Sequence, residues 1–347
     1  MLAVAVTPPA SPAAGGLLDA LPSVAITVAG VGLTIAVGFY LRRSRTIADG
    51  TDASVFALLV RVFIPALILS RVIGNEALSD WRNLVLPPAT AFGLVTLGML
   101  AAFGLATLMP KTLPAGKTRR TFALSAGMFN YGYITVPLVI ALFAYDGGRT
   151  LAVLFVFNVG VEAAMWGVGL TLLAGHVEPG WWRRMFSPPV VATVIAVAVN
   201  LTDQALGLSE SMPAPVAGVG EAIMTCLFWL GGAAVPMGLI LTGSAIADDW
   251  LQCRLRQGVR TVVAASVLRL LILPALFIGL AVMVPMTPEL RHVLIFQAAM
   301  PAAVFPIVLA RHYQGDVGTA LRVAIGTSIV AIVTMPIWIV LGLWLIR

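Results

Sequence analysis

Long apolar segments separated by short polar ones run from about residue 20 to the C-terminus. Each segment is about as long as the ~20 apolar residues that an α-helix needs to cross a bilayer. The pattern predicts ten membrane-spanning helices, near residues 21–41, 52–72, 84–109, 119–144, 150–174, 188–207, 216–245, 258–284, 290–311 and 318–345. Residues 1–20, rich in Ala, Pro and Gly, are expected to form a flexible tail before the first helix.

The composition agrees with this pattern. Of the 347 residues, 60% are hydrophobic and 10% are charged, and the mean hydropathy is +1.00. A soluble protein carries roughly 25% charged residues, and no connection is long enough for a soluble domain. We therefore expect an all-α polytopic membrane protein whose main partner is the lipid bilayer.

The basic residues are distributed unevenly between the two sides of the predicted helices. Fourteen of the 21 lie in alternate connections: Arg42, Arg43, Arg45, Lys111, Lys117, Arg119, Arg120, Arg183, Arg184, Arg254, Arg256, Arg260, Arg311 and Arg322. Five lie on the opposite side: Arg71, Arg82, Arg149, Arg291 and Arg347. This asymmetry is the positive-inside pattern, and it places both termini outside a cytoplasmic membrane. The net charge of +6 therefore reflects topology and not a nucleic-acid partner.

Two apolar segments contain proline where a continuous helix needs an amide donor: residues 126–137 and 297–306. Pro137 deprives the carbonyl of Tyr133 of its usual partner, and Pro301 does the same for Gln297. Within a membrane such groups persist only where protein or a water-filled cavity satisfies them. A matched pair of interrupted helices, one in each half, indicates a transporter's binding site.

The two halves share landmarks at a nearly constant offset. Pro65 recurs as Pro236 after 171 residues, and Pro137 recurs as Pro306 after 169. The motif beginning at Tyr145 recurs at Tyr313 after 168 residues. This spacing predicts two five-helix repeats, residues 21–174 and 175–347. Because five is odd, the second repeat enters the membrane from the opposite face and the repeats are inverted.

A helix that restarts inside the membrane exposes unpaired amides and the positive end of its dipole. Two such starts facing each other form a cradle for a carboxylate. The residues predicted to form it are Val136, Pro137 and Leu138 from one helix and Val304, Phe305 and Pro306 from the other. The alternative, proline as a simple kink, is our interpretation of Pro65, Pro236, Pro274 and Pro336.

Polar residues beside the two breaks are candidate ligands. Asn130 and Gln297 are predicted to line the cavity, since an amide both donates and accepts hydrogen bonds. Packing between helices is the alternative for both residues. Tyr131 and Tyr133 either border the cavity or pack against neighbouring helices.

Three ionisable residues lie deep in predicted helices: Arg61, Glu162 and Arg269. A charge at that depth costs at least about 2.5–3.5 kcal/mol on insertion scales, so a function or a partner is expected. Glu162 is predicted either to carry a coupling proton or to form a static ion pair with Arg269. Asn158 belongs to the same candidate cluster, and Arg61 is expected to extend towards the membrane surface.

Six motifs, in order, resemble the auxin efflux carrier family of membrane transporters. They begin at Gly38, Val62, Asn130, Ser187, Gly232 and Ala299 and read GFYLRR, VFIPALI, NYGYITVP, SPP, GAAVPMGL and AMPAAV. The family includes plant auxin exporters and bacterial malonate or malate carriers. The resemblance implies ten helices in a fold related to bile-acid/sodium symporters, with broken helices four and nine crossing in mid-membrane. It also implies a scaffold of helices 1, 2, 6 and 7 and a moving transport domain of helices 3–5 and 8–10.

We therefore expect a secondary transporter of a small organic carboxylate that works by an elevator-like motion. The alternatives are a sodium- or proton-coupled symporter of bile-acid-like substrates and a membrane sensor that binds the same ligand without moving it. The sequence has no hydrolase, metalloprotease or P-loop motif, so we expect no enzyme activity, no metal site and no cofactor. A coupling ion, H⁺ or Na⁺, and a homodimeric assembly remain open.

Overall fold

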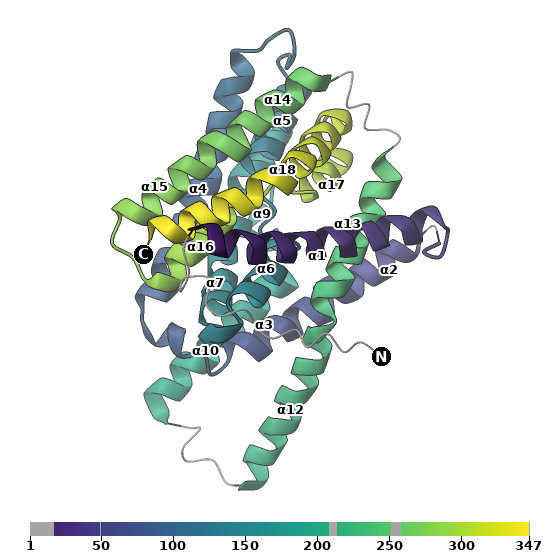
Figure 1. Ribbon diagram of the computed structural model, residues 1–347. Helices are drawn as coiled ribbons and strands as arrows, with labels where there is room; N and C mark the ends of the chain where they lie inside the picture. The colour runs from purple at the N-terminus through teal and green to yellow at the C-terminus, as the bar shows by residue number, and fades with distance from the viewer. Residues whose placement is uncertain (1–16, 49, 208–213, 251–257, 347) are drawn as a thin grey trace.

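The computed structural model describes residues 17–48, 50–207, 214–250 and 258–346. Within these ranges the chain forms helices joined by turns, and its strand content is a single isolated bridge (Figure 1). Residues 1–16 of the predicted tail lie outside the described residues. The first helix begins at Leu17, four residues before the predicted start at residue 21.

The helices of the first half are α1 (Leu17–Arg43), α2 (Thr51–Leu58), α3 (Ile64–Val72), α4 (Arg82–Thr107), α5 (Lys117–Gly127), α6 (Thr135–Leu142), α7 (Arg149–Ala164) and α8 (Leu170–Ala174). The second half contains α9 (Trp181–Arg184), α10 (Pro188–Leu206), α12 (Ala214–Gly232), α13 (Ala234–Trp250), α14 (Val259–Val267), α15 (Leu273–Met283), α16 (Pro288–Ala299), α17 (Phe305–His312) and α18 (Val317–Leu345). Short 3₁₀ turns span Glu76–Ser79 and Ala144–Asp146. Turns of π-helix join α2 to α3 (Leu59–Phe63), α7 to α8 (Met165–Gly169) and α14 to α15 (Leu268–Ile272).

Eight helices in the described ranges are long and apolar enough to cross a membrane. They correspond to eight of the ten predicted segments. The other two predicted segments, residues 119–144 and 290–311, are each divided into two shorter helices, α5 and α6 in the first and α16 and α17 in the second.

Side chains just before several helices explain where those helices begin. The Ser187 hydroxyl accepts from the amide of Val190 at the start of α10, and Thr287 does the same for Leu290 in α16. A proline follows each of these two caps, in the first helical turn, where its missing amide costs no hydrogen bond. Asp316 caps α18 by accepting from the amide of Thr319 at 3.0 Å.

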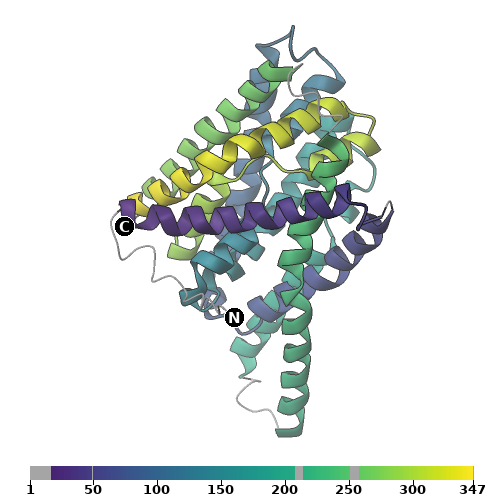
Figure 2. The same ribbon diagram turned by 45° about the vertical axis from the view of Figure 1, so that its right-hand side comes forward.

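The helices pack as two groups. Helices α1, α2, α3, α10, α12 and α13 contact one another, and α4–α8 pack with α14–α18. In the first group α1 and α13 cross closely, as Figures 1 and 2 both show. Gly38 and Gly243 allow this approach, because a side chain on either would collide with the backbone of the facing helix. Between the two groups, α1 contacts α18, and both α3 and α10 contact α7.

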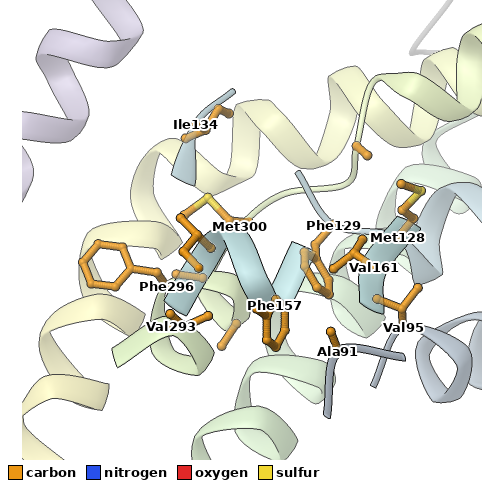
Figure 3. Close-up of a cluster of buried hydrophobic side chains, with 14 of the residues drawn as sticks. Ala91, Val95, Met128, Phe129, Ile134, Phe157, Val161, Val293, Phe296 and Met300 are labelled. Carbon is orange, nitrogen blue, oxygen red and sulfur yellow. The ribbon is translucent and has the colours of Figure 1, made fainter. Parts of the chain in front are cut away.

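The second group surrounds a dense apolar cluster, drawn in Figure 3. The rings of Phe129 and Phe157 lie 6.4 Å apart at its centre, and Phe277 packs edge-on against Phe129 at 5.8 Å. Gly127, the last residue of α5, contacts the backbone of α4 too closely to accept a side chain. The end of α5 is therefore fixed against rigid neighbours where the chain leaves the helix.

Candidate functional site

The two interrupted helices meet at their breaks. Residues 128–134 lie between α5 and α6, and residues 300–304 lie between α16 and α17. Phe129 of the first break and Ala302 of the second form an antiparallel bridge. The Asn130 amide donates to the Pro301 carbonyl at 2.9 Å, and the Ala303 amide donates to the Met128 carbonyl at 3.0 Å. One amide and one carbonyl from each break are thus satisfied by the other break, as an apolar environment requires.

Proline occupies the first turn of both restarted helices. Pro137 is the third residue of α6, and Pro306 is the second residue of α17. A proline in the first turn does not interrupt helical hydrogen bonding. Pro301 lies between α16 and α17 and cannot donate to the carbonyl of Gln297, four residues earlier.

Arg269 fills the place of that missing donor. It is fully buried in the π-helical turn Leu268–Ile272, and its Nη2 donates to the carbonyls of Gln297 at 3.2 Å and Ala298 at 3.1 Å. Its guanidinium lies over the rings of Phe129 (5.1 Å) and Phe277 (5.3 Å). A cation at the C-terminal end of α16 also complements the negative end of that helix dipole.

The predicted ion pair between Glu162 and Arg269 is wrong. Among the described residues no salt bridge joins them. Arg269 binds backbone carbonyls and lies against the ring of Phe129, whereas Glu162, on α7, lines the cavity that is described next. Arg269 also lies outside the wall of that cavity.

A cavity of about 330 Å³ lies where the two helix groups meet beside the crossing. From the first group it is lined by Phe56, Val60, Ile64, Leu67, Ile68, Ser187, Pro189, Val190, Thr193, Ala234, Val235 and Gly238. The second group contributes Asn130, Tyr131, Gly132, Tyr133, Val136, Pro137, Phe155, Asn158, Val159, Glu162, Met165, Trp166, Ala303, Val304 and Phe305. The wall is mostly apolar, and its polar side chains gather on the side of the crossing.

Glu162 is the carboxylate of this cavity. Its Oε1 accepts from the Tyr131 hydroxyl at 2.7 Å, and its Oε2 accepts from the Trp166 indole nitrogen at 2.8 Å. The Trp166 ring in turn packs edge-on against Phe305 at 5.9 Å. Glu162 therefore connects α7 with both broken helices.

A second set of hydrogen bonds ties Gln297 to the first break. Its Nε2 donates to the Tyr131 carbonyl at 3.4 Å and to Asn158 Oδ1 at 3.5 Å. Its Oε1 accepts from the Thr135 hydroxyl at 3.4 Å, and Asn158 Nδ2 donates to the Tyr131 carbonyl at 3.3 Å. Gln297 is fully buried behind the cavity wall, so its amide positions the break and does not face a ligand.

Asn130 differs from Gln297. Asn130 is 4% exposed and lines the cavity. Its side-chain amide makes no hydrogen bond within the part of the chain that the structure describes. Tyr133, Val304 and Phe305 also line the cavity, and their backbone amides likewise have no acceptor among the described residues. These donors, from both breaks, point to an external acceptor.

The predicted cradle needs correction in its details. Val136 and Leu138 line the start of α6, but their amides already donate to the carbonyls of Gly132 (3.0 Å) and Ile134 (3.4 Å). Leu138 and Pro306 are buried outside the cavity wall. In the first break the free amide is that of Tyr133, earlier than predicted, because the first turn of α6 forms its own hydrogen bonds. In the second break Val304 and Phe305, both predicted, have the free amides.

A comparison with known proteins bears on what such a site does. The family described as "Membrane transport protein" matches residues 177–339. The resemblance to membrane transporters is confirmed. An uncharacterized transporter of Methanothermobacter thermautotrophicus is 27% identical over 317 residues, which cover 90% of this chain and 96% of that protein. Protein PIN-LIKES 2 of Arabidopsis thaliana is 24% identical over 166 residues, 46% of this chain and 35% of that protein.

Several residues of this candidate site were missed by the sequence reasoning. Trp166 lies four residues after Glu162 on the same helix face, a spacing that allows contact along a helix. Thr135 opens α6 and bonds both the Asn130 carbonyl at 2.8 Å and Gln297. Gly238 of α13 lies opposite Tyr133, where an added Cβ would come within 3.0 Å of its ring.

Proposed function

We propose that this protein is a secondary transporter of a small organic carboxylate across the cytoplasmic membrane. The observation that carries the proposal is the convergence of unpartnered donors from both breaks on one cavity: the Asn130 side chain and the amides of Tyr133, Val304 and Phe305. Amides at restarted helices are suited to an anion without requiring a buried lysine.

The shape of the cavity favours a substrate with one carboxylate and an apolar body. Donors gather on one side, while the opposite wall from α3, α10 and α13 is apolar except for Thr193 and Ser187. A second carboxylate against that wall would lose its hydration without compensation. The volume of about 330 Å³ suits a small molecule.

An elevator-like motion is the proposed mechanism. The cavity lies between the two packed groups, so the group containing both broken helices can serve as the transport domain and carry its ligand past the scaffold of α1–α3, α10, α12 and α13. The cavity wall on the scaffold side consists mainly of side chains without hydrogen-bonding groups. Sliding across such a wall breaks few specific contacts.

An architecture of two inverted five-helix repeats accompanies this mechanism. Corresponding elements begin at similar offsets: α1 and α10 are 171 residues apart, α5 and α16 are 171, and α7 and α18 are 168. The antiparallel pairing of the two breaks supports an inverted relation, since each broken helix would enter from its own side of the membrane.

Uptake into proteoliposomes tests the function. Radiolabelled benzoate and malonate serve as probes of a mono- and a dicarboxylate, and benzoate is expected to accumulate or exchange faster than in empty liposomes. A protein that binds benzoate but never moves it would be a sensor. Uptake of taurocholate in place of both probes would favour a symporter of bile-acid-like substrates.

A further inference from the structure

We propose that Glu162 is the proton-binding group that couples transport to the proton gradient, and that Tyr131 links its protonation to binding of the anion. The inference rests on the proposed function and names the coupling ion of the same site.

The charge balance of the cavity is unfavourable for an anion while Glu162 is ionised. The wall contains no Lys, Arg or His among the described residues, and its ionisable side chains are Glu162, Tyr131 and Tyr133. Two negative charges in one weakly solvated cavity repel each other strongly. An anion therefore needs one added positive charge, and a proton on Glu162 provides it.

No cation of the neighbouring elements takes that role. Arg269 lies against the ring of Phe129 and donates to backbone carbonyls. Arg61, in the π-helical turn Leu59–Phe63, is exposed and does not line the cavity. The titratable groups that face Glu162 are Tyr131 and Tyr133, both from the first break. Arg183 and Arg184, in the connection before α10, do not line the cavity. Arg183 stacks on Trp182 and Arg184 stacks on Tyr313.

The ionised carboxylate is held by two donors. Tyr131 donates to Oε1 and Trp166 donates to Oε2. Both hydrogens point at the oxygens that a sodium ion would need, so a metal cation would have to displace them. A proton needs no such rearrangement at Oε2, where the indole continues to donate.

Protonation reverses one hydrogen bond. When a proton binds Oε1, the Glu162 hydroxyl donates to the Tyr131 oxygen, because a phenol accepts as well as donates. The hydrogen of Tyr131 then turns away from Glu162 into the cavity, and Tyr131 remains neutral. One proton has been bound, and one new donor faces the substrate carboxylate beside Asn130. Protonation thus removes the repulsion and adds a ligand in the same step.

The test measures benzoate affinity of the purified full-length protein between about pH 6 and about pH 9, where benzoate stays ionised. Wild-type affinity is expected to fall roughly tenfold per pH unit above the titration of Glu162, as uptake of one proton requires. Glu162→Gln should bind benzoate tightly and without pH dependence, because its amide donates to Tyr131 while its oxygen accepts from Trp166.

Glu289→Gln is the matched control. Glu289 is a buried carboxylate of α16 that pairs with Arg149 at 2.9 Å and lies outside the cavity. This variant should keep the wild-type slope. Tyr131→Phe should keep a pH dependence but bind benzoate roughly tenfold more weakly at low pH, because it lacks the released hydroxyl. If Tyr131→Phe binds like wild type at low pH, the hydrogen-bond switch is wrong.

Transport provides the second measurement. In proteoliposomes that contain a pH-sensitive dye, each benzoate taken up should carry one proton, and Glu162→Gln should exchange benzoate without moving protons. Benzoate transport that is independent of pH, or that requires sodium, overturns the proton coupling and leaves the proposed function standing. Failure of benzoate and malonate to bind at any pH would overturn both.

Discussion

Arg269 donates from Nη2 to the carbonyl of Gln297, the group that Pro301 leaves without its helical partner. The two residues lie on different helices, 28 positions apart in the chain. The arginine thus completes the end of α16 where the chain turns into the crossing. Its remaining donors, Nε and Nη1, have no hydrogen-bond partner among the described residues and lie between two phenylalanine rings.

Replacing this arginine tests its role. Arg269→Met keeps an apolar side chain of similar length but leaves the carbonyls of Gln297 and Ala298 unpaired. We expect a loss of about 1–3 kcal/mol in the free energy of unfolding, the cost of stranding buried hydrogen-bonding groups. Thermal unfolding in detergent measures it. Arg61→Met, at an exposed position, is the control and should change stability little. Equal melting temperatures for Arg269→Met and wild type would contradict this assignment.

Asn130 should matter for binding and not for folding. Asn130→Ala is expected to weaken benzoate binding by about 1.5–3 kcal/mol, the scale for a hydrogen bond to a charged group. Its melting temperature should stay close to wild type, because the side chain has no partner within the described chain. Isothermal titration calorimetry gives the affinity.

The control for Asn130 is another buried asparagine. Asn200 accepts from the Gly74 amide at 2.6 Å and donates to the Val72 carbonyl at 2.6 Å, away from the cavity. Asn200→Ala should show the opposite pattern, a lower melting temperature with unchanged affinity. If both variants lose stability and neither loses affinity, Asn130 is a packing residue.

The topology can be tested independently of transport. The distribution of basic residues between alternate connections predicts that both termini lie outside the cytoplasm. A C-terminal alkaline phosphatase fusion should therefore be active, and a C-terminal green fluorescent protein should be dark. The reverse result would invert the proposed orientation of the cavity.

Asp316 lies outside the membrane-spanning helices, at the cap of α18, and we expect its carboxyl to make the free energy of unfolding depend on pH. Partial burial acts to raise the pKa of its carboxyl, but hydrogen bonds from Thr118 and Thr319 and the charge of Arg322 outweigh burial and lower the pKa below 3.8. The folded state therefore gains stability from the ionised carboxylate above that value. This gain is lost as the pH falls through the lowered pKa.

The corresponding variant is Asp316→Asn. Near neutral pH it should melt a few degrees below wild type, because the amide replaces a charged cap that also binds Thr118 at 2.8 Å. The difference should shrink as the pH falls below the ordinary value of 3.8. A difference that grows in acid would show that the carboxylate does not provide the stabilisation.

The sequence predicted the helices and their interruptions well, because hydropathy and proline act locally. The segments with Pro137 and Pro306 are interrupted just before these prolines, each of which stands in the first turn of a restarted helix, and α10 and α16 begin at Ser-Pro and Thr-Pro. Partners between helices were harder to predict. Glu162 and Arg269 lie near the middle of the membrane-spanning segments Arg149–Ala174 and Val259–Met283, but the side of the crossing that each one faces depends on packing.

One local relation could have identified the partner of Arg269. A proline at position 301 leaves a known carbonyl free at position 297, and a buried cation is a natural donor to it. The free amide of the first break, that of Tyr133, could not be placed from sequence. Its position depends on whether the first turn of α6 closes at Val136 or later, which the backbone geometry of the break decides.

The antiparallel bridge between Phe129 and Ala302 constrains how the protein is made. Residues 128–130 are synthesised and inserted about 170 positions before the segment that satisfies their backbone groups. Until α16 and α17 enter the bilayer, the amide of Asn130 and the carbonyl of Met128 need water or a chaperoning partner. During biogenesis the first half of the chain should therefore stay incompletely folded at its break until the second half is inserted. Expressed alone it should be degraded, and co-expression with the second half should rescue it.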